Sequence, residues 1–98
     1  HSWTIEVNKE DSNWHPLLEL WIRRSGDGYS NVNPNQCVKS IVGGTSFQKI
    51  DNIPIQFYSG RCERNDVPIQ FELRNVSVLT PADSYQTDIV YTITITVP

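Results

Sequence analysis

The alternation of apolar and polar residues along this chain is typical of β-strands. Residues 89–97 carry apolar side chains at every odd position and threonine at 92, 94 and 96. Because side-chain direction reverses at each residue of a strand, one face of this segment is apolar and the other carries hydroxyls. Residues 2–7 follow the same rule, with Trp3, Ile5 and Val7 on one face. The two segments are predicted to be strands whose apolar faces, Tyr91 included, lie in a core.

The middle of the chain predicts shorter strands. In residues 17–24, Leu18, Leu20 and Ile22 share one face and Trp21 lies on the other. Residues 45–50 form another short strand candidate after a pair of glycines. The segments 53–57 and 67–71 match at four of five positions and each has proline near its start, where a missing N–H disturbs a strand least. They predict two strands with the same facing pattern.

Turn-forming residues separate these segments. Asp11-Ser12-Asn13, Ser25–Gly28 and Pro81–Ser84 are typical turn sequences, and the Asn-rich residues 29–36 predict a loop. A change of phase at Arg74-Asn75 indicates a bulge or a bend that passes between sheets. About seven short strands with regular turns and no convincing helix predict an antiparallel two-sheet β-sandwich, Ig-like in architecture, with residues 1–98 as a single domain.

Composition narrows the class of function. The net charge is −3 and the arginines are scattered, so the chain lacks the basic footprint of a nucleic-acid-binding protein. No apolar run approaches the roughly 18 residues of a membrane span. We therefore expect no nucleic-acid partner and no membrane span.

Cys37 and Cys62 are the only cysteines. Their separation excludes the short Cys-x-x-Cys spacing of a redox or zinc site. Both lie in polar, loop-like surroundings, which favours a disulfide over two buried thiols. A disulfide in turn predicts a secreted or cell-surface protein.

Candidate chemistry is sparse. No Gly-x-Ser-x-Gly nucleophile motif is present, and the carboxylates are spread along the chain, so we expect no enzyme and no cofactor. His1 and His15 could bind copper through the amino terminus and two imidazoles, but an ordinary chain end is the favoured interpretation of His1. The alternating oxygen-bearing residues 27–31 suggest calcium, but they lack the spacing and final glutamate of an EF-hand, so an ordinary turn is favoured.

Aromatic residues suggest a carbohydrate-binding alternative, because sugar rings stack on exposed indole and phenol rings. Turn-proximal aromatics and one outward-facing indole in mid-strand are the candidates. They are Trp14, Trp21, Tyr29 and Tyr58. For Trp21, coverage by a neighbouring segment is the competing interpretation.

Both ends of the chain resemble secreted bacterial sandwich proteins. The segment Pro81-Ala82-Asp83-Ser84-Tyr85 followed by a long alternating strand is similar to the end of spore-coat-U-like and usher-type pilins. The opening Trp3-Thr4-Ile5-Glu6-Val7 resembles that of WxL cell-surface domains. Asp83 replaces the glycine of the pilin turn, and the second Trp-x-Leu of WxL domains is absent.

This resemblance implies surface assembly or cell-wall attachment. In a pilin-like protein, Trp3, Ile5 and Val7 would form a strand-exchange face that inserts into the next subunit. The competing interpretation is that this strand pairs within its own domain. The sequence thus predicts a non-catalytic extracellular structural or adhesive module, such as a fibre subunit or cell-wall-associated domain, whose partners are other subunits or cell-surface proteins. The alternative is a carbohydrate-binding module whose partners are glycans.

Overall fold

The structure is a computed structural model that describes residues 2–96, and in that range it consists of seven strands with no helix. This confirms the predicted all-β fold. The strands are β1 (Ser2–Asn13), β2 (Glu19–Arg24), β3 (Ser40–Val42), β4 (Gln48–Ile50), β5 (Ile55–Arg61), β6 (Ile69–Arg74) and β7 (Gln86–Thr96).

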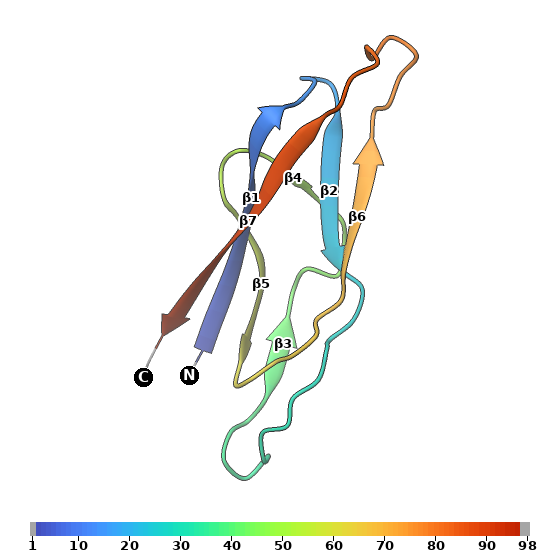
Figure 1. The fold of residues 1–98 in the computed structure, drawn as a ribbon. Helices are drawn as coiled ribbons and strands as arrows, with labels where there is room; N and C mark the ends of the chain where they lie inside the picture. Colours follow the sequence, from blue (N-terminus) through green and yellow to red (C-terminus); the bar gives the residue numbers. More distant parts are fainter. Residues whose placement is uncertain (1, 97–98) are drawn as a thin grey trace.

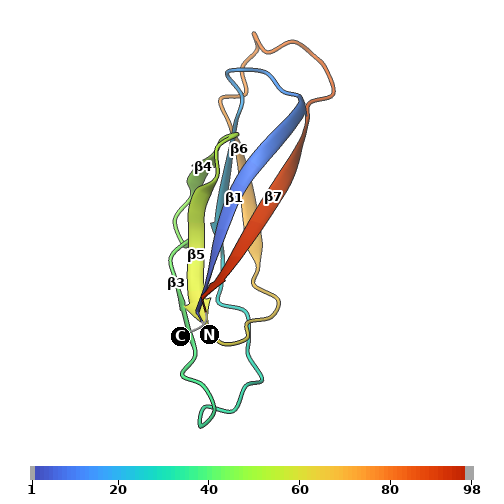
Figure 2. The same cartoon turned by 90° about the vertical axis from the view of Figure 1, so that its left-hand side faces the viewer.

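The strands form two antiparallel sheets, which confirms the predicted sandwich. The larger sheet has the order β3-β5-β1-β7 and the smaller one the order β4-β2-β6. In Figure 1, β7 lies close to β2 at the upper end of the molecule and diverges from β6 toward the lower end. Figure 2 shows the β6–β7 loop at the upper end, opposite the start of β1 and the end of β7.

Strand β1 is at the centre of the larger sheet. It pairs with β5 over residues 2–7 and with β7 over residues 2–13. Trp3, Ile5 and Val7, predicted as an exchangeable face, therefore belong to a strand that is paired on both sides within its own chain. Exchange through this face would remove the central strand, so the structure supports the competing interpretation of these three residues.

The predicted turn at residues 11–13 is wrong, because β1 continues through it. Asp11 pairs with Thr87 and Asn13 pairs with Gln86, after a register shift between Asp11 and Asn13. The Asn13 side chain also donates to the main-chain oxygen of Ser84 at 3.0 Å. Pairing with a long partner strand outweighs the local turn preference of this segment.

The core lies between the sheets and is small. A register shift between Ile5 and Glu6 allows two consecutive residues of β5, Phe57 and Tyr58, to pack inward, and their rings meet edge to face at 4.8 Å. Leu18 and Ile22 are buried as their shared face predicts. The buried cluster consists of Val7, Ile22, Ile50, Phe57 and Tyr58.

The two segments that resemble each other in sequence became strands of different sheets. Pro54 and Pro68 directly precede β5 and β6, as predicted. Phe57 is buried, whereas Phe71, at the same place in the second segment, is 45% exposed. Beyond β6, Asn75 has a φ of 64° and the chain turns toward the other sheet, in agreement with a bend at this point.

The molecule is long and has a large surface for its mass. Its extents are 56 × 22 × 17 Å and its radius of gyration is 16.2 Å, against about 13 Å for a compact chain of this length. Its accessible surface is 6438 Å², where a compact monomer of this mass has about 5,700 Å². The two sheets therefore leave apolar surface uncovered.

Gly60 marks a close approach between β5, β3 and the indole of Trp3. A Cβ atom at this position would lie 2.5 Å from the Ser40 carbonyl oxygen and 2.6 Å from the Trp3 ring. We expect Gly60→Ala to destabilise the domain by about 1–3 kcal/mol, because backbone and a packed ring must both move. Denaturant unfolding monitored by circular dichroism measures this change.

Gly26→Ala is the matched control. Its added Cβ would meet only the Pro68 ring, at 3.1 Å. This substitution should be nearly neutral, because it also reduces the entropy of the unfolded chain. An equal loss of unfolding free energy in the two variants would contradict the proposed close approach at Gly60.

Candidate functional site

The disulfide predicted from the sequence is present between Cys37 and Cys62. Cys62 has a φ of 68° and begins the loop that connects β5 to β6. The indole N–H of Trp3 donates to the Cys62 carbonyl oxygen at 2.7 Å. This hydrogen bond joins the loop to the start of β1, and the disulfide joins it to the segment before β3.

The inner face of β7 is largely uncovered. Its apolar residues lie directly opposite inward-facing residues of β1, and in an antiparallel pair opposed side chains point to the same face. The side chains nevertheless remain open to solvent: Tyr91 is 45% exposed, Ile93 62% and Ile95 63%. The prediction that Tyr91 is a core residue gave the correct face, but the face is not covered. The opposed pairs are Val7–Tyr91, Ile5–Ile93 and Trp3–Ile95.

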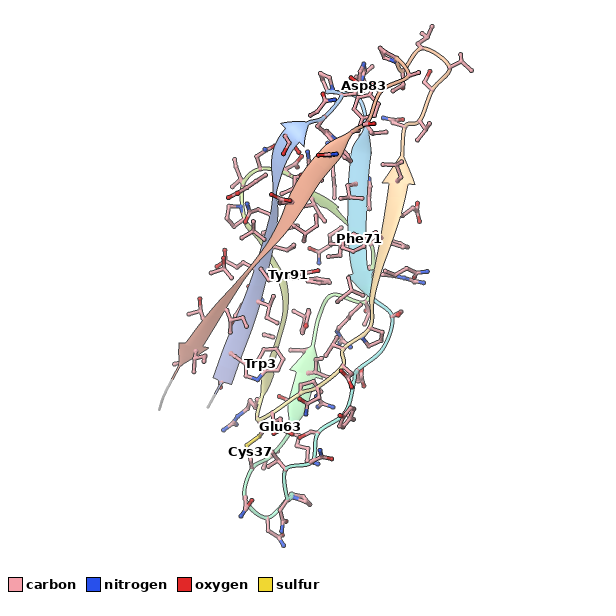
Figure 3. The ribbon with its side chains drawn as sticks, in the orientation of Figure 1. Trp3, Cys37, Glu63, Phe71, Asp83 and Tyr91 are labelled. Carbon is pink, nitrogen blue, oxygen red and sulfur yellow. A yellow bond between two sulfur atoms is a disulfide. The ribbon has the colours of Figure 1, made fainter. Side chains whose placement is uncertain are left out.

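The inner face of β6 is likewise exposed to solvent, although it lies opposite buried or partly buried residues. Phe71 lies opposite Ile22, which is fully buried, and Leu73 lies opposite Leu20. Yet Phe71 is 45% exposed and Leu73 51%. Figure 3 shows Phe71 and Tyr91 on the sides of β6 and β7 that face each other. We call the five residues Phe71, Leu73, Tyr91, Ile93 and Ile95 the open side of the sandwich.

Two unpaired strand edges border the open side. Within residues 2–96, β7 pairs only with β1, and β6 pairs only with β2. The other side of the sandwich is bridged by residues 51–54, which pass from β4 in one sheet to β5 in the other. A hydrogen bond from the Lys9 N–H to the Asp51 carbonyl, at 2.9 Å, holds this connection against β1. The sandwich is therefore closed along one side and open along the other.

Near the start of β1 the open side deepens into an apolar cavity of about 430 Å³. Trp3 and Ile5 form part of its lining, together with Ile93 and Ile95 from β7. The loop after Cys62 closes its far wall, and there Arg64 Nε is buried without a hydrogen-bond partner. The remaining lining residues are Tyr58, Cys62, Glu63, Arg64 and Val67.

The open side is mainly apolar. Four of its five side chains are hydrocarbon. Burial raises the pKa of Tyr91 above its ordinary value of 10.0, so the phenol is neutral at physiological pH. Burial, and then the neighbouring Tyr91, also raise the pKa of Tyr58 behind it, while Arg24 opposes the shift. A partner would bind here by covering apolar area and by pairing with strand edges.

The aromatic residues considered for sugar stacking do not form one platform. Tyr58 is buried, with its ring edge to face against Trp3 at 5.9 Å, so it offers no free face. The Arg74 guanidinium stacks over Trp21 at 3.8 Å, which is the coverage by a neighbour that the sequence left open. Tyr29 is exposed and belongs to an isolated bridge with Asn65.

Trp14 lies beside a separate polar cavity of about 300 Å³. The Lys9 ammonium sits 4.7 Å above its ring and pairs with Asp11 at 2.8 Å. Desolvation raises the pKa of Asp11, but hydrogen bonds from Lys9 and Asn52 outweigh it and leave that pKa below its usual value. One face of the Trp14 ring is thus occupied by a cation of the same chain.

The residues considered for metal binding are not gathered in the described range. Within residues 2–96, no group of three or more His, Cys, Asp or Glu side chains is placed to hold a metal ion. His1 lies outside the described residues, and His15 Nδ1 accepts from the Leu17 N–H at 3.2 Å. Asp27, the first residue of the calcium candidate, pairs with Arg24 at 2.6 Å.

No protein-family model, curated protein sequence or solved structure matches this chain. In the part of the chain that the structure describes, no helix is long and apolar enough to cross a membrane. The function must therefore be inferred from the open side itself.

Sequence reasoning placed Tyr91, Ile93 and Ile95 on the correct face but assigned that face to the core, and it assigned neither Phe71 nor Leu73 to a core. One feature of the sequence could have indicated an unprotected strand edge. The last predicted strand is longer than the others and has no charged residue from 89 to 96. An edge strand of this kind is one that natural proteins usually protect.

Proposed function

We propose that this protein is a non-catalytic structural module of an extracellular assembly, and that it binds another chain along its open side. The observation that carries this proposal is the exposure of inner-face residues on both edge strands, Phe71 and Leu73 on β6 and Tyr91, Ile93 and Ile95 on β7. Exposed apolar residues gathered on the inner faces of two edge strands are typical of an interaction site.

Three further features support a structural role. The open side is bordered by two free strand edges, and adding an extended segment to a sheet edge is a common mode of protein recognition. The disulfide supports an oxidising, extracytoplasmic location. The resemblance of the chain ends to surface-assembly proteins agrees with strand-edge binding and with an extracytoplasmic location. The carbohydrate alternative has no comparable observation in its favour, because its candidate rings are buried, stacked or far apart.

The test is to measure the exposed apolar surface and the assembly of the purified protein. In dilute solution we expect the folded protein to bind the apolar dye ANS. On concentration, or with a partner chain, the dye should be released as the mass rises above 11.2 kDa. Ile95→Lys and Leu73→Lys should each reduce dye binding, and Ile95→Lys should also reduce assembly of the purified protein, since a charge resists burial. Fluorescence titration and light scattering measure the two effects.

Val42→Lys provides the matched control. Val42 is 59% exposed, close to the value for Ile95, but it lies on β3 at the opposite edge of the same sheet. It should leave dye binding and assembly unchanged. A folded protein that binds no dye and stays monomeric at every concentration would refute the proposal, as would an equal effect of Val42→Lys.

A further inference from the structure

The four edge strands of the sandwich differ in how well they are protected. Edge strands resist unwanted pairing when they are short, charged, bulged or interrupted by proline. β3 and β4 have only three residues each. β6 has six residues and carries Glu72 and Arg74. These three edges are short or charged.

β7 lacks these protections from residue 89 onward. It has eleven residues, its one charged residue, Asp88, lies near its start, and residues 89–96 contain neither charge nor proline. Its pairing with β1 runs without a register shift from Ser2 to Asp11, so this stretch carries no bulge. A long, regular and uncharged edge of this kind is a template for pairing with another strand.

The sequence of β7 is also complementary to itself. If two copies of β7 pair antiparallel about a two-fold axis at Ile93, each Tyr91 lies opposite the partner subunit's Ile95, and Ile93 lies opposite the partner subunit's Ile93. On the outer face, each Thr92 lies opposite the partner subunit's Thr94. Aromatic–β-branched and Thr–Thr pairs are favourable cross-strand neighbours. In this register no two charges from residues 90–96 meet.

We propose that β7 pairs with β7 of a second copy of this chain, which gives a two-fold dimer with one continuous eight-stranded sheet. This inference rests on the proposed function and names its partner. Pairing satisfies the free main-chain groups of both β7 edges, and it brings Tyr91, Ile93 and Ile95 of each subunit beside those of the other. A symmetric contact of one patch with itself is the usual form of a homodimer interface.

The size of this contact sets the expected strength. Six partly exposed apolar side chains and one strand ladder make a small contact against the roughly 1,200–2,000 Å² of stable interfaces. We therefore expect a reversible, concentration-dependent dimer. Phe71 and Leu73 on β6 lie outside the ladder, so the dimer leaves part of the open side free for another chain.

Charge substitution at the two-fold axis tests the proposal. Ile93→Lys and Ile93→Glu each place like charges opposite one another and should weaken the dimer by more than about tenfold. An equimolar mixture of the two variants should restore it, because lysine then faces glutamate. Sedimentation equilibrium measures the masses against 11.2 kDa for the monomer. Circular dichroism verifies that both variants are folded.

Phe71→Lys distinguishes the β7 dimer from the broader proposal that the open side binds another chain. Phe71 is on the open side but not on β7, so its substitution should leave the dimer intact. Hydrogen exchange gives a second measurement, in which β7 amides should gain protection as wild-type protein is concentrated. A wild-type monomer that still binds ANS would overturn the β7 dimer and leave the proposed function standing. Dimerisation that Phe71→Lys abolishes, or a mixture that stays monomeric, would also overturn it.

Discussion

Replacing Arg24 with methionine is expected to destabilise the domain by about 2–4 kcal/mol, a large part of the stability of a protein of this size. Arg24 points to the inner face of β2 and its side chain is buried. Its guanidinium donates to the Gly43 carbonyl through Nε at 2.5 Å and to the Gly26 carbonyl through Nη1 at 3.2 Å. Methionine fills much of the same volume but leaves both carbonyls without these donors. Denaturant unfolding at neutral pH measures the loss.

The two carbonyls belong to the loop after β2 and the loop before β4, which lie at the same end of the small sheet because the two strands are antiparallel. Arg24 therefore ties these two loops together. Asp27→Asn is the control for charge. Asp27 pairs with the same guanidinium at 2.6 Å but is 69% exposed, so neutralising it should change the free energy of unfolding by less than about 1 kcal/mol. A loss in Asp27→Asn as large as that in Arg24→Met would show that the ion pair, rather than the carbonyl contacts, stabilises this end.

The faces of the strands could be predicted from the sequence, because side-chain direction in a strand follows position alone. The alternation from Ile89 onward put Tyr91, Ile93 and Ile95 on the inner face, and their pairing with β1 confirms it. Whether an inner face is covered depends on where the opposite sheet ends. That is set by strand order and by the divergence of β7 from β6, which no local pattern encodes (Figure 1).

The other differences between the predicted and observed elements also have physical causes. β3 was missed because Ser40–Val42 has no alternation to detect and is held by its pairing with residues 59–61 of β5. The turn predicted at residues 11–13 is a strand because β7 is long enough to pair with it. The disulfide was predictable because only one pairing of two cysteines exists. Its connection to Trp3 through the Cys62 carbonyl required the fold.

The second large effect is expected from removing the disulfide. Replacing Cys37 and Cys62 with serine should destabilise the domain by roughly 3–4 kcal/mol, the chain-entropy value for a separation of 25 residues. It should also release the loop after Cys62, so that the Trp3 indole loses its 2.7 Å hydrogen bond and the wall of the apolar cavity moves away. Denaturant unfolding measures the first effect, and a red shift of Trp3 emission under native conditions measures the second.

Trp3 must be the sole emitter for this measurement, so the comparison uses a Trp14→Phe, Trp21→Phe background with and without the disulfide. Cys62→Ser alone and Cys37→Ser alone should each resemble the double variant, because either removes the cross-link.

If only stability falls and Trp3 emission is unchanged, the disulfide acts on the unfolded chain and the cavity wall is held by other contacts. If emission shifts while dimerisation through β7 is retained, the cavity and the β7 edge are independent parts of the open side. Loss of both would mean that the disulfide end of the sandwich fixes the course of β7 as well, since Ile93 and Ile95 line the same cavity.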